Sequence, residues 1–560
     1  MKFTASIHDL DYKDVAYEYL PFLAPIIEGK EDTKIKFTIG KGGLKELVAT
    51  SDLRNVSINA PEPLVLQKDE PRELYLKITP ETNEPHSPVA IDWRYGDHLK
   101  GVQYAGEGLN SYGKIAAGQT GYMENPDQNS IMTIQGSIES FNIEQWIATI
   151  GKLVGDNKER ENFMKSHEVG AGRIGKNVFP IQVQIVSDHI MLGKQDFGNG
   201  TVNVLVTKKN TSFNLYTPVT SGYGNFDYNK KAVNLTLDKY MLYKKLPVKI
   251  NQNIGYVPLN FVNGGSNAFK VKLPDINLKI NNLFLQNHNL GSVSTRVHQN
   301  GDNLYLESGV LTNKDYTAKF SGVNYCFGCV GTDSYVNLVA DADVTNLGNL
   351  IYNLDFGRLV GDGLGQVKAS LQWNGGFQDF KVYGIAGRLQ GNFYDGNILN
   401  INTGTAGAVM KFLDLQGLFQ MALDPNDLFN NGIFFTKMNV DVSLLTTRLD
   451  INQFDMYGPL ADVKANGITN LEGGELDVNL SVMPHLGFAI AVAAGIATLN
   501  PIVGLAVYGV ELLTGGLQNK LVTATYDITG TLGNPVVKKT NINENIVHNV
   551  NSSFDLDYGL

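Results

Sequence analysis

The feature that most constrains the fold of this chain is a period of two in its apolar residues. In five segments every second residue is apolar and the residues between are mostly polar; these segments are 276–280, 367–371, 438–444, 476–482 and 522–528. Successive side chains of a β-strand point to opposite faces, so each segment predicts a strand with one apolar and one polar face. The chain is therefore predicted to be mainly β.

Turn signals separate these strands. Asn-Gly or Asp-Gly pairs stand at 199–200, 263–264, 300–301, 374–375, 395–396 and 431–432. Such pairs favour hairpins because both central residues of a type I′ turn need a positive φ. The apolar face of an antiparallel sheet must be covered. We therefore expect a long, curled, groove-like (taco-shaped) antiparallel sheet or one whose apolar face holds a ligand, although a β-sandwich gives the same alternation.

Helical patterns are few and recur in one context. A strand end, a capping Asp, Asn or Thr and a short amphipathic helix are predicted within 6–27, 137–154 and 342–350. Recurrence of this kind suggests tandem units stacked along one axis. The predicted organisation is strand-plus-helix units over 1–165, further β-sheet over 166–274, a β-groove region over 275–540 and a polar tail over 541–560.

One apolar segment near the C-terminal end must be tested as a membrane span. No charged residue occurs from 486 to 510, and about 20 such residues would cross a bilayer as a helix. Asn500-Pro501 interrupts the run, which predicts a hairpin of two short helices over 486–517. They either plug the end of the sheet or lie on a membrane surface. The candidate membrane-facing residues are Phe488, Ile490, Val492, Ile496, Leu499, Pro501, Val503 and Leu505.

Composition and motifs argue against nucleic-acid binding, metal binding and catalysis. The net charge is -10 and the basic residues are dispersed, whereas a nucleic-acid partner needs a basic face. The nine histidines show no helical metal-ligand spacing, and no nucleophile elbow occurs. A glycine-rich loop at 170–176 lacks the strand before it and the helix after it that phosphate binding requires. We expect no enzyme activity, no metal and no cofactor.

The two cysteines, Cys326 and Cys329, lie in a glycine-punctuated turn. A redox-active C-x-x-C pair stands at a helix N-terminus, so we expect a structural loop disulfide or two free thiols. The pair is compatible with an oxidising compartment. The first residues lack a basic stretch followed by an apolar one, so either the chain is cytoplasmic or its export signal lies upstream on a longer precursor, which we favour.

Over about 275–539 the order of segments resembles the C-terminal region of AsmA-like proteins, in particular the YhdP branch. The resemblance rests on the succession of segments 343–350, 363–375, 387–398, 412–418, 427–435, 456–463, 482–486, the interrupted apolar run and 526–535. It implies a periplasmic bridge in Gram-negative bacteria, attached to the inner membrane by an N-terminal helix. Because that helix is absent and family members are longer, the chain is expected to be a truncated form or half of a split protein.

The resemblance implies that phospholipid moves between the inner and outer membranes along an apolar groove. The groove-lining candidates are Leu278, Leu371, Phe393, Val440 and Val478, although strand register could place any of them in the wall. Expected partners are phospholipids, a membrane surface (the outer membrane at the C-terminal end) and envelope proteins. The alternative is a scaffold for outer-membrane protein assembly or envelope integrity that transports nothing.

Overall fold

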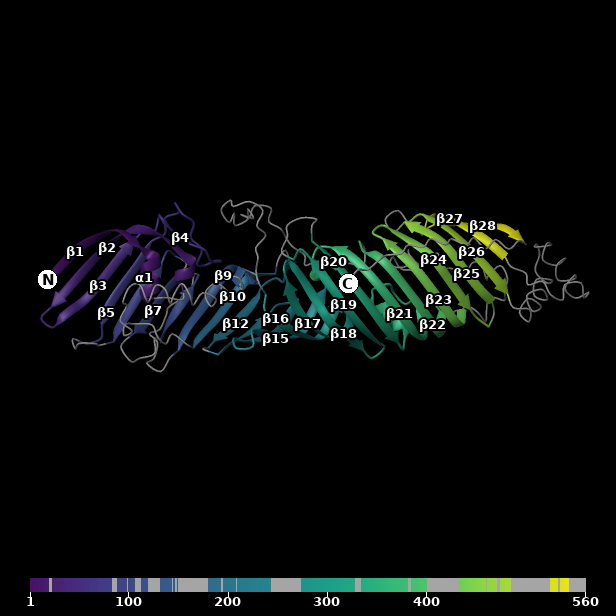
Figure 1. Cartoon of the computed structure of the whole chain (residues 1–560), viewed down its shortest axis with the longest axis horizontal. Coiled ribbons are helices and arrows are strands. Elements are labelled where there is room, and N and C mark those ends of the chain that lie inside the picture. The colour runs from purple at the N-terminus through teal and green to yellow at the C-terminus, as the bar shows by residue number, and fades with distance from the viewer. Residues whose placement is uncertain are drawn as a thin grey trace, which may run out of the picture. The chain divides into compact units, whose positions relative to one another are not determined.

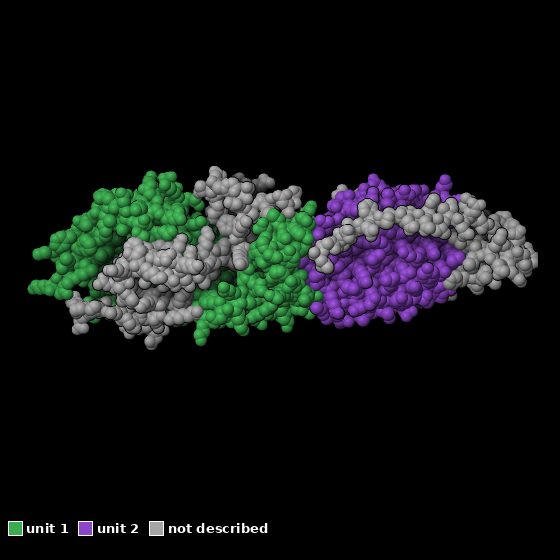
Figure 2. All heavy atoms as spheres, in the orientation of Figure 1, with its two compact units in different colours: residues 1–309, 323–335, 374–379 green, residues 310–322, 336–373, 380–560 purple. Residues whose placement is uncertain are grey.

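A computed structural model gives the fold. It describes residues 1–19, 23–82, 88–97, 99–105, 112–118, 131–143, 145–146, 149, 180–192, 195–207, 209–242, 273–327, 334–380, 384–399, 433–459, 461–470, 474–484, 524–531 and 534–542. The described residues fall into two compact units, coloured separately in Figure 2. Unit 1 holds residues 1–309, 323–335 and 374–379, and unit 2 holds residues 310–322, 336–373 and 380–560.

Unit 1 is built mainly of strands that lie side by side largely in chain order (Figure 1). Its helical elements are α1 (Tyr12–Tyr19) and the 3-10 turn η1 (Ala24–Ile26). Its strands are β1 (Lys2–Asp11), β2 (Ile27–Gly40), β3 (Gly43–Ser51), β4 (Val56–Ile58), β5 (Leu74–Pro80), β6 (Val89–Tyr95), β7 (Leu99–Ala105), β8 (Tyr112–Ala117), β9 (Met132–Asn142), β10 (Ile181–Leu192), β11 (Gln195–Asp196), β12 (Gly200–Val206), β13 (Asn210–Tyr216), β14 (Thr220–Asp227), β15 (Ala232–Leu242), β16 (Asp275–Leu285) and β17 (His288–Asn300).

Unit 2 is also a sheet, accompanied by the short helix α4 (Leu347–Asn353). Its strands are β20 (Tyr335–Val344), β21 (Val360–Asn374), β22 (Ala386–Ile398), β23 (Ile433–Leu445), β24 (Arg448–Tyr457), β25 (Ala461–Asn470), β26 (Leu476–Pro484), β27 (Ala524–Thr531) and β28 (Asn534–Ile542). The remaining elements are β18 (Asn303–Asn313), β19 (Tyr316–Tyr325) and η2 (Phe377–Asp379). The predicted fold class is confirmed, because the chain is mainly β and its open, curled sheets carry only short helices.

Most neighbouring strands pair antiparallel, as the hairpin signals predict, but three junctions in unit 1 are parallel. β8 pairs with β9, β9 with β10 and β15 with β16 in this sense. A parallel pair cannot be joined by a tight turn and needs a crossover connection. These three junctions correspondingly have longer connections than the hairpins, and sequence alternation alone did not reveal them.

Among the described residues, α1 follows β1 and α4 follows β20, and side chains cap the predicted helix starts. The Asp11 carboxylate accepts hydrogen bonds from the backbone N–H groups of Lys13 (3.0 Å) and Asp14 (3.4 Å). The Asn142 side chain accepts one from Gln145 N–H at 3.0 Å, and the Asn346 side chain one from Asn349 N–H at 2.8 Å. These bonds satisfy N–H groups that have no partner within the first helical turn.

The Asp395-Gly396 pair is not a hairpin, which corrects one sequence prediction. Both residues lie inside β22, where Asp395 has a φ of 51°. On the neighbouring strand β21, Asp362 (φ 48°) pairs with Gly396, and Gly363 has a φ of 84°. The left-handed residues therefore kink two paired strands together without ending either of them. The predicted hairpins at 263–264 and 431–432 and the loop at 170–176 lie outside the described residues.

Candidate functional site: the apolar face of the sheet

The strand register aligns apolar residues of unit 1 in a row that crosses the sheet, which we call the central row. Each member pairs directly with the next on the neighbouring strand. The central row runs from β5 to β16 through Leu76, Trp93, Gly101, Ile115, Ile134, Val183, Val204, Phe213, Gly224, Leu235 and Leu278. None of these residues carries a charge or a hydrogen-bonding side chain other than the indole of Trp93. At about 4.8 Å per strand, the row is on the order of 50 Å long.

The large side chains of the central row are half-buried, so this apolar surface stays accessible. Two glycines make room for its aromatic rings. A Cβ at Gly101 would lie 2.5 Å from the Trp93 ring, and a Cβ at Gly224 would lie 2.2 Å from the Phe213 ring. Each ring therefore lies over a glycine, whose backbone carries no side chain, so the ring projects less from the face of the sheet.

The next apolar row on the same face, the covered row, is mostly buried. It runs through Leu74, Tyr95, Leu99, Ala117, Gly136, Ile185, Val202, Leu215, Gly222, Leu237 and Ile280. The segment 52–67 packs against its β6–β10 part through Leu53, Val56 and Leu66. The Tyr95 hydroxyl donates to the Leu64 carbonyl at 3.0 Å, and burial raises the pKa of Tyr95 to about 12. The segment 52–67 therefore covers one side of the apolar face.

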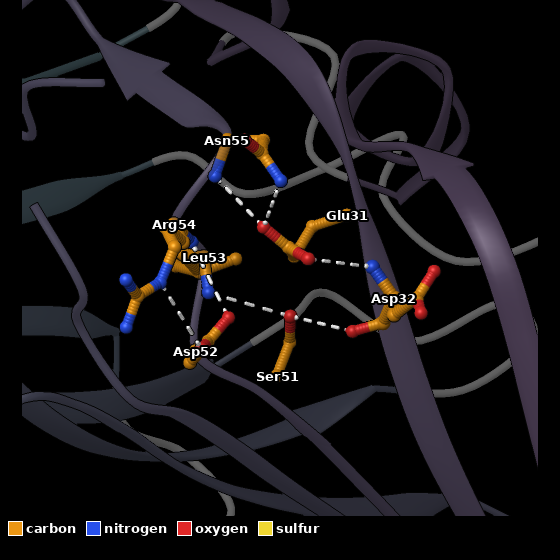
Figure 3. Close-up of polar contacts among 7 residues, drawn as sticks. All are labelled: Glu31, Asp32, Ser51, Asp52, Leu53, Arg54 and Asn55. Atoms are coloured by element: carbon orange, nitrogen blue, oxygen red, sulfur yellow. Dashed lines mark hydrogen bonds and ion pairs between the residues drawn. The ribbon is translucent and has the colours of Figure 1, made fainter. Parts of the chain in front are cut away.

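Polar contacts anchor this covering segment to β2 and β3 (Figure 3). The Glu31 carboxylate accepts hydrogen bonds from the backbone N–H of Asn55 at 2.7 Å and from its side chain at 3.0 Å. The Ser51 hydroxyl donates to the Asp32 carbonyl at 3.0 Å and accepts from the Leu53 N–H at 3.4 Å. The start of the segment is thus fixed by hydrogen bonds to β2 and β3.

Unit 2 has the same kind of rows, and they are more deeply buried. One row joins Phe393, Met438, Met456, Val463 and Val482 across β22 to β26. These five side chains are between 0% and 8% exposed. They belong to one hydrophobic cluster that also contains Leu347 of α4 and Ile528 of β27. The apolar face of unit 2 is therefore a packed core over these strands.

The outer faces of both units are mainly polar. In unit 1, Asn277 on β16 donates to Asn234 on β15 at 2.9 Å. In unit 2, the Arg388 guanidinium binds the Asp441 carboxylate with two bonds of 2.8 Å and 2.5 Å. Burial alone would raise the pKa of Asp441, but hydrogen bonds from Arg388, Gln390 and Asn452 together lower it. The two faces of each sheet thus differ in chemistry as the alternation predicts.

The five groove candidates lie on the apolar faces but in different surroundings. Leu278 ends the central row of unit 1 and is half-buried, as is Leu371 on β21. Phe393, Val440 and Val478 lie in three adjacent rows of the unit 2 core. Phe393 is 5% and Val478 1% exposed. Their role in lipid binding remains a prediction.

Other candidates fall largely outside the described residues. All eight membrane-facing candidates lie in the apolar segment, which is outside the described residues. Cys329 also lies outside the described residues. Cys326 follows β19 with a φ of 53° and is disulfide-bonded. Its pairing with Cys329 stays a prediction. Within the described ranges, no helix is long and apolar enough to cross a membrane, and no three His, Cys, Asp or Glu side chains gather as metal ligands would.

The sequence reasoning missed most of the accessible surface. Val204, Phe213 and Leu235 carry the central row through unit 1, yet of the five predicted alternating segments only 276–280 lies in this unit. The covering segment 52–67 was also missed, because Leu53, Val56 and Leu66 show neither a period of two nor a helical period. Alternation within 202–206 and 233–237 was the available signal.

Comparison with known proteins assigns the family. The model of the family described as "YhdP protein" matches residues 9–537. The intermembrane phospholipid transporter YhdP of Escherichia coli (strain K12) is 30% identical over 145 residues, which are 26% of this chain and 11% of that protein. The match thus covers only a small part of the relative's length. No solved structure matches. The chain, matched by the family model over nearly all of its length, belongs to the YhdP family.

Proposed function

We propose that this chain transports phospholipid between membranes, with acyl chains lying on its apolar face. The observation that carries the proposal is the central row, an uncharged and half-buried surface that continues from β5 to β16. Membership of the YhdP family and the similarity to an intermembrane phospholipid transporter support it. The proposed role requires no catalysis.

The physical basis is the hydrophobic effect. Each CH₂ group of an acyl chain gains about 0.8 kcal/mol when it leaves water for an apolar surface. A surface that is apolar at every strand gives similar stabilisation at each step, so a lipid can move along it without passing through a fully hydrated state. The polar outer face offers no comparable stabilisation, which confines the lipid to one side of the sheet.

In its fuller form, the proposal places the protein in the periplasm of a Gram-negative cell as a bridge between the inner and outer membranes. The broken apolar segment 486–517 would meet a membrane surface at the outer-membrane end. The transported lipid supports outer-membrane homeostasis.

Native mass spectrometry of the purified chain tests the proposal. We expect bound phospholipid on the unmodified protein and little on the double variant Leu235→Asn/Leu278→Asn, which makes two neighbouring members of the central row polar. The matched control is Thr236→Asn/Lys279→Asn, because these residues are the next ones along the same strands and point to the outer face. Circular dichroism confirms that both variants fold. Absence of lipid from the unmodified protein would favour a scaffold role instead.

A further inference from the structure

The two margins of the unit 1 sheet differ in charge. Beyond the central row, on the side away from the covered row, lies an edge row that includes Val206, Phe226, Val233 and Ile276. Exposed lysines lie just past this row. Lys41 lies in the turn between β2 and β3 and Lys45 at the start of β3, Lys209 lies between β12 and β13, and Lys230 and Lys231 lie between β14 and β15. No ion pair involves these five ammonium groups among the described residues.

Three of these lysines lie on adjacent turns. The backbone N–H of Tyr228 donates to the Lys209 carbonyl at 3.2 Å, which joins the turn after β12 to the turn after β14. The nearby Asp227 carboxylate accepts from the backbone N–H groups of Asn229 (2.9 Å) and Lys230 (3.2 Å). This carboxylate is engaged with the turn itself. The ammonium groups of Lys209, Lys230 and Lys231 therefore remain available to an external anion.

The opposite ends of the same strands carry acidic groups. Asp188 is exposed near the end of β10, and the Asp196 carboxylate on β11 lies 2.7 Å from the His189 ring. Asp238 lies near the far end of β15, where the neighbouring Lys239 donates to the Pro218 carbonyl at 2.9 Å. The far margin thus mixes acidic and basic groups, whereas the lysine turns offer only unpaired ammonium groups among the described residues, so an anionic end is attracted to the lysine turns.

We propose that Lys209, Lys230 and Lys231 bind the phosphate of a phospholipid headgroup while its acyl chains lie across the edge and central rows. This inference rests on the proposed function and deepens it by fixing the orientation of the lipid. Charge complementarity selects the occupant, because the lysine turns directly adjoin an uncharged face. The chains then point towards the covered row, and the headgroup stays at the open margin in contact with water.

Binding of short-chain lipids tests the orientation. The probes are dioctanoyl phosphatidylglycerol, dioctanoylglycerol, which lacks the phosphate, and inorganic phosphate. The variant Lys209→Ala/Lys230→Ala/Lys231→Ala is compared with Lys34→Ala/Lys36→Ala/Lys279→Ala, which removes three exposed lysines from strand positions on the outer face. We expect the turn variant to bind phosphatidylglycerol roughly tenfold more weakly, as the loss of three exposed charge pairs would give, and dioctanoylglycerol as before. The control should bind both lipids as the unmodified protein does.

Three results would overturn the inference. Unchanged phosphatidylglycerol binding by the turn variant would exclude the lysines while leaving lipid binding on the apolar face intact. Inorganic phosphate that binds the unmodified protein as tightly as the lipid does would make the turns a free-phosphate site. Failure of the unmodified protein to bind either lipid would refute the proposed function itself. Weaker phosphatidylglycerol binding in high salt, with no change for dioctanoylglycerol, would add support, because salt screens exposed charges.

Discussion

The apolar rows of the two units have the same origin in sequence but differ in accessibility. Val183 in the central row of unit 1 is half-buried, whereas Val463 in the corresponding type of row in unit 2 is 0% exposed. Both are valines on alternating strands with polar neighbours. Val463 and its neighbours across the strands, Met456 and Val482, belong to one continuous cluster of buried side chains.

This difference shows that a period of two determines which face is apolar but not whether that face is open. Accessibility depends on how completely other side chains pack over the face and on segments that cover it, such as 52–67 in unit 1. Substitutions in the unit 2 row should therefore act on stability. Substitutions in the central row of unit 1 should act more on lipid binding.

The largest expected effect comes from a charge placed in each row. Val463→Asp should lower the free energy of unfolding by about 4 kcal/mol, because an unpaired carboxylate would be buried. Val183→Asp should lower it by only about 1–2 kcal/mol, because water reaches that site. Urea denaturation measures both, with Lys464→Asp on the outer face as control. Equal losses at the two valines would break the comparison.

A side chain added beneath an aromatic ring should have the next largest effect. Gly101→Val should lower the free energy of unfolding by about 2 kcal/mol, since its Cβ would lie 2.5 Å from the Trp93 ring. Thermal unfolding followed by tryptophan fluorescence measures this. Adding Trp93→Leu to the Gly101→Val variant should recover part of the loss. No recovery would show that the ring contact is not the cause.

Added lipid should protect the two units unequally. At about ten times its dissociation constant, a ligand stabilises the form that binds it by about 1.4 kcal/mol. Amide hydrogen exchange in the presence of dioctanoyl phosphatidylglycerol should therefore slow about tenfold in β12–β15 and change little in β23–β26. Equal slowing in both regions would mean that the buried face of unit 2 opens to take lipid as well.

The smallest effect concerns the outer face of unit 2. Because the pKa of Asp441 is lowered in the folded protein, its stabilising contribution is present above the unfolded pKa of about 3.9 and is lost as pH falls through the folded value. We expect a loss below about 1 kcal/mol between pH 5 and pH 3, typical of accessible ion pairs. Urea midpoints across this range measure it. Asp441→Asn should flatten the dependence, whereas Asp477→Asn, on the same face, should not; similar profiles would contradict this account.

The sequence predicted the strands wherever one residue in two was apolar and the other polar. Alternation located β16, β21, β23 and β26, and capping residues such as Asn346 located the helix starts. The hairpin prediction failed at Asp395-Gly396, because a left-handed residue can kink a strand as well as end one. Local sequence could not distinguish the two outcomes, which depend on the matching kink in the paired strand.

The candidate site was less predictable than the fold. Phe393 and Leu278 were both placed on an apolar face, but only the three-dimensional packing separates the buried ring of Phe393 from the half-exposed side chain of Leu278. The parallel pairing of β15 with β16, which aligns Leu235 with Leu278, depends on a crossover rather than on a turn signal. Accessibility and register are set by contacts distant in sequence.

Photo-crosslinking tests the central claim most directly. A photoreactive amino acid is placed at Leu278, and in a second protein at Lys279, its outward neighbour on β16; Val478 and Asn479 provide the same comparison on β26 of unit 2. Our account predicts strong capture of phospholipid at Leu278, weak capture at Val478 and none at Lys279 or Asn479. Capture at Lys279 equal to that at Leu278, or no capture at Leu278, would contradict it.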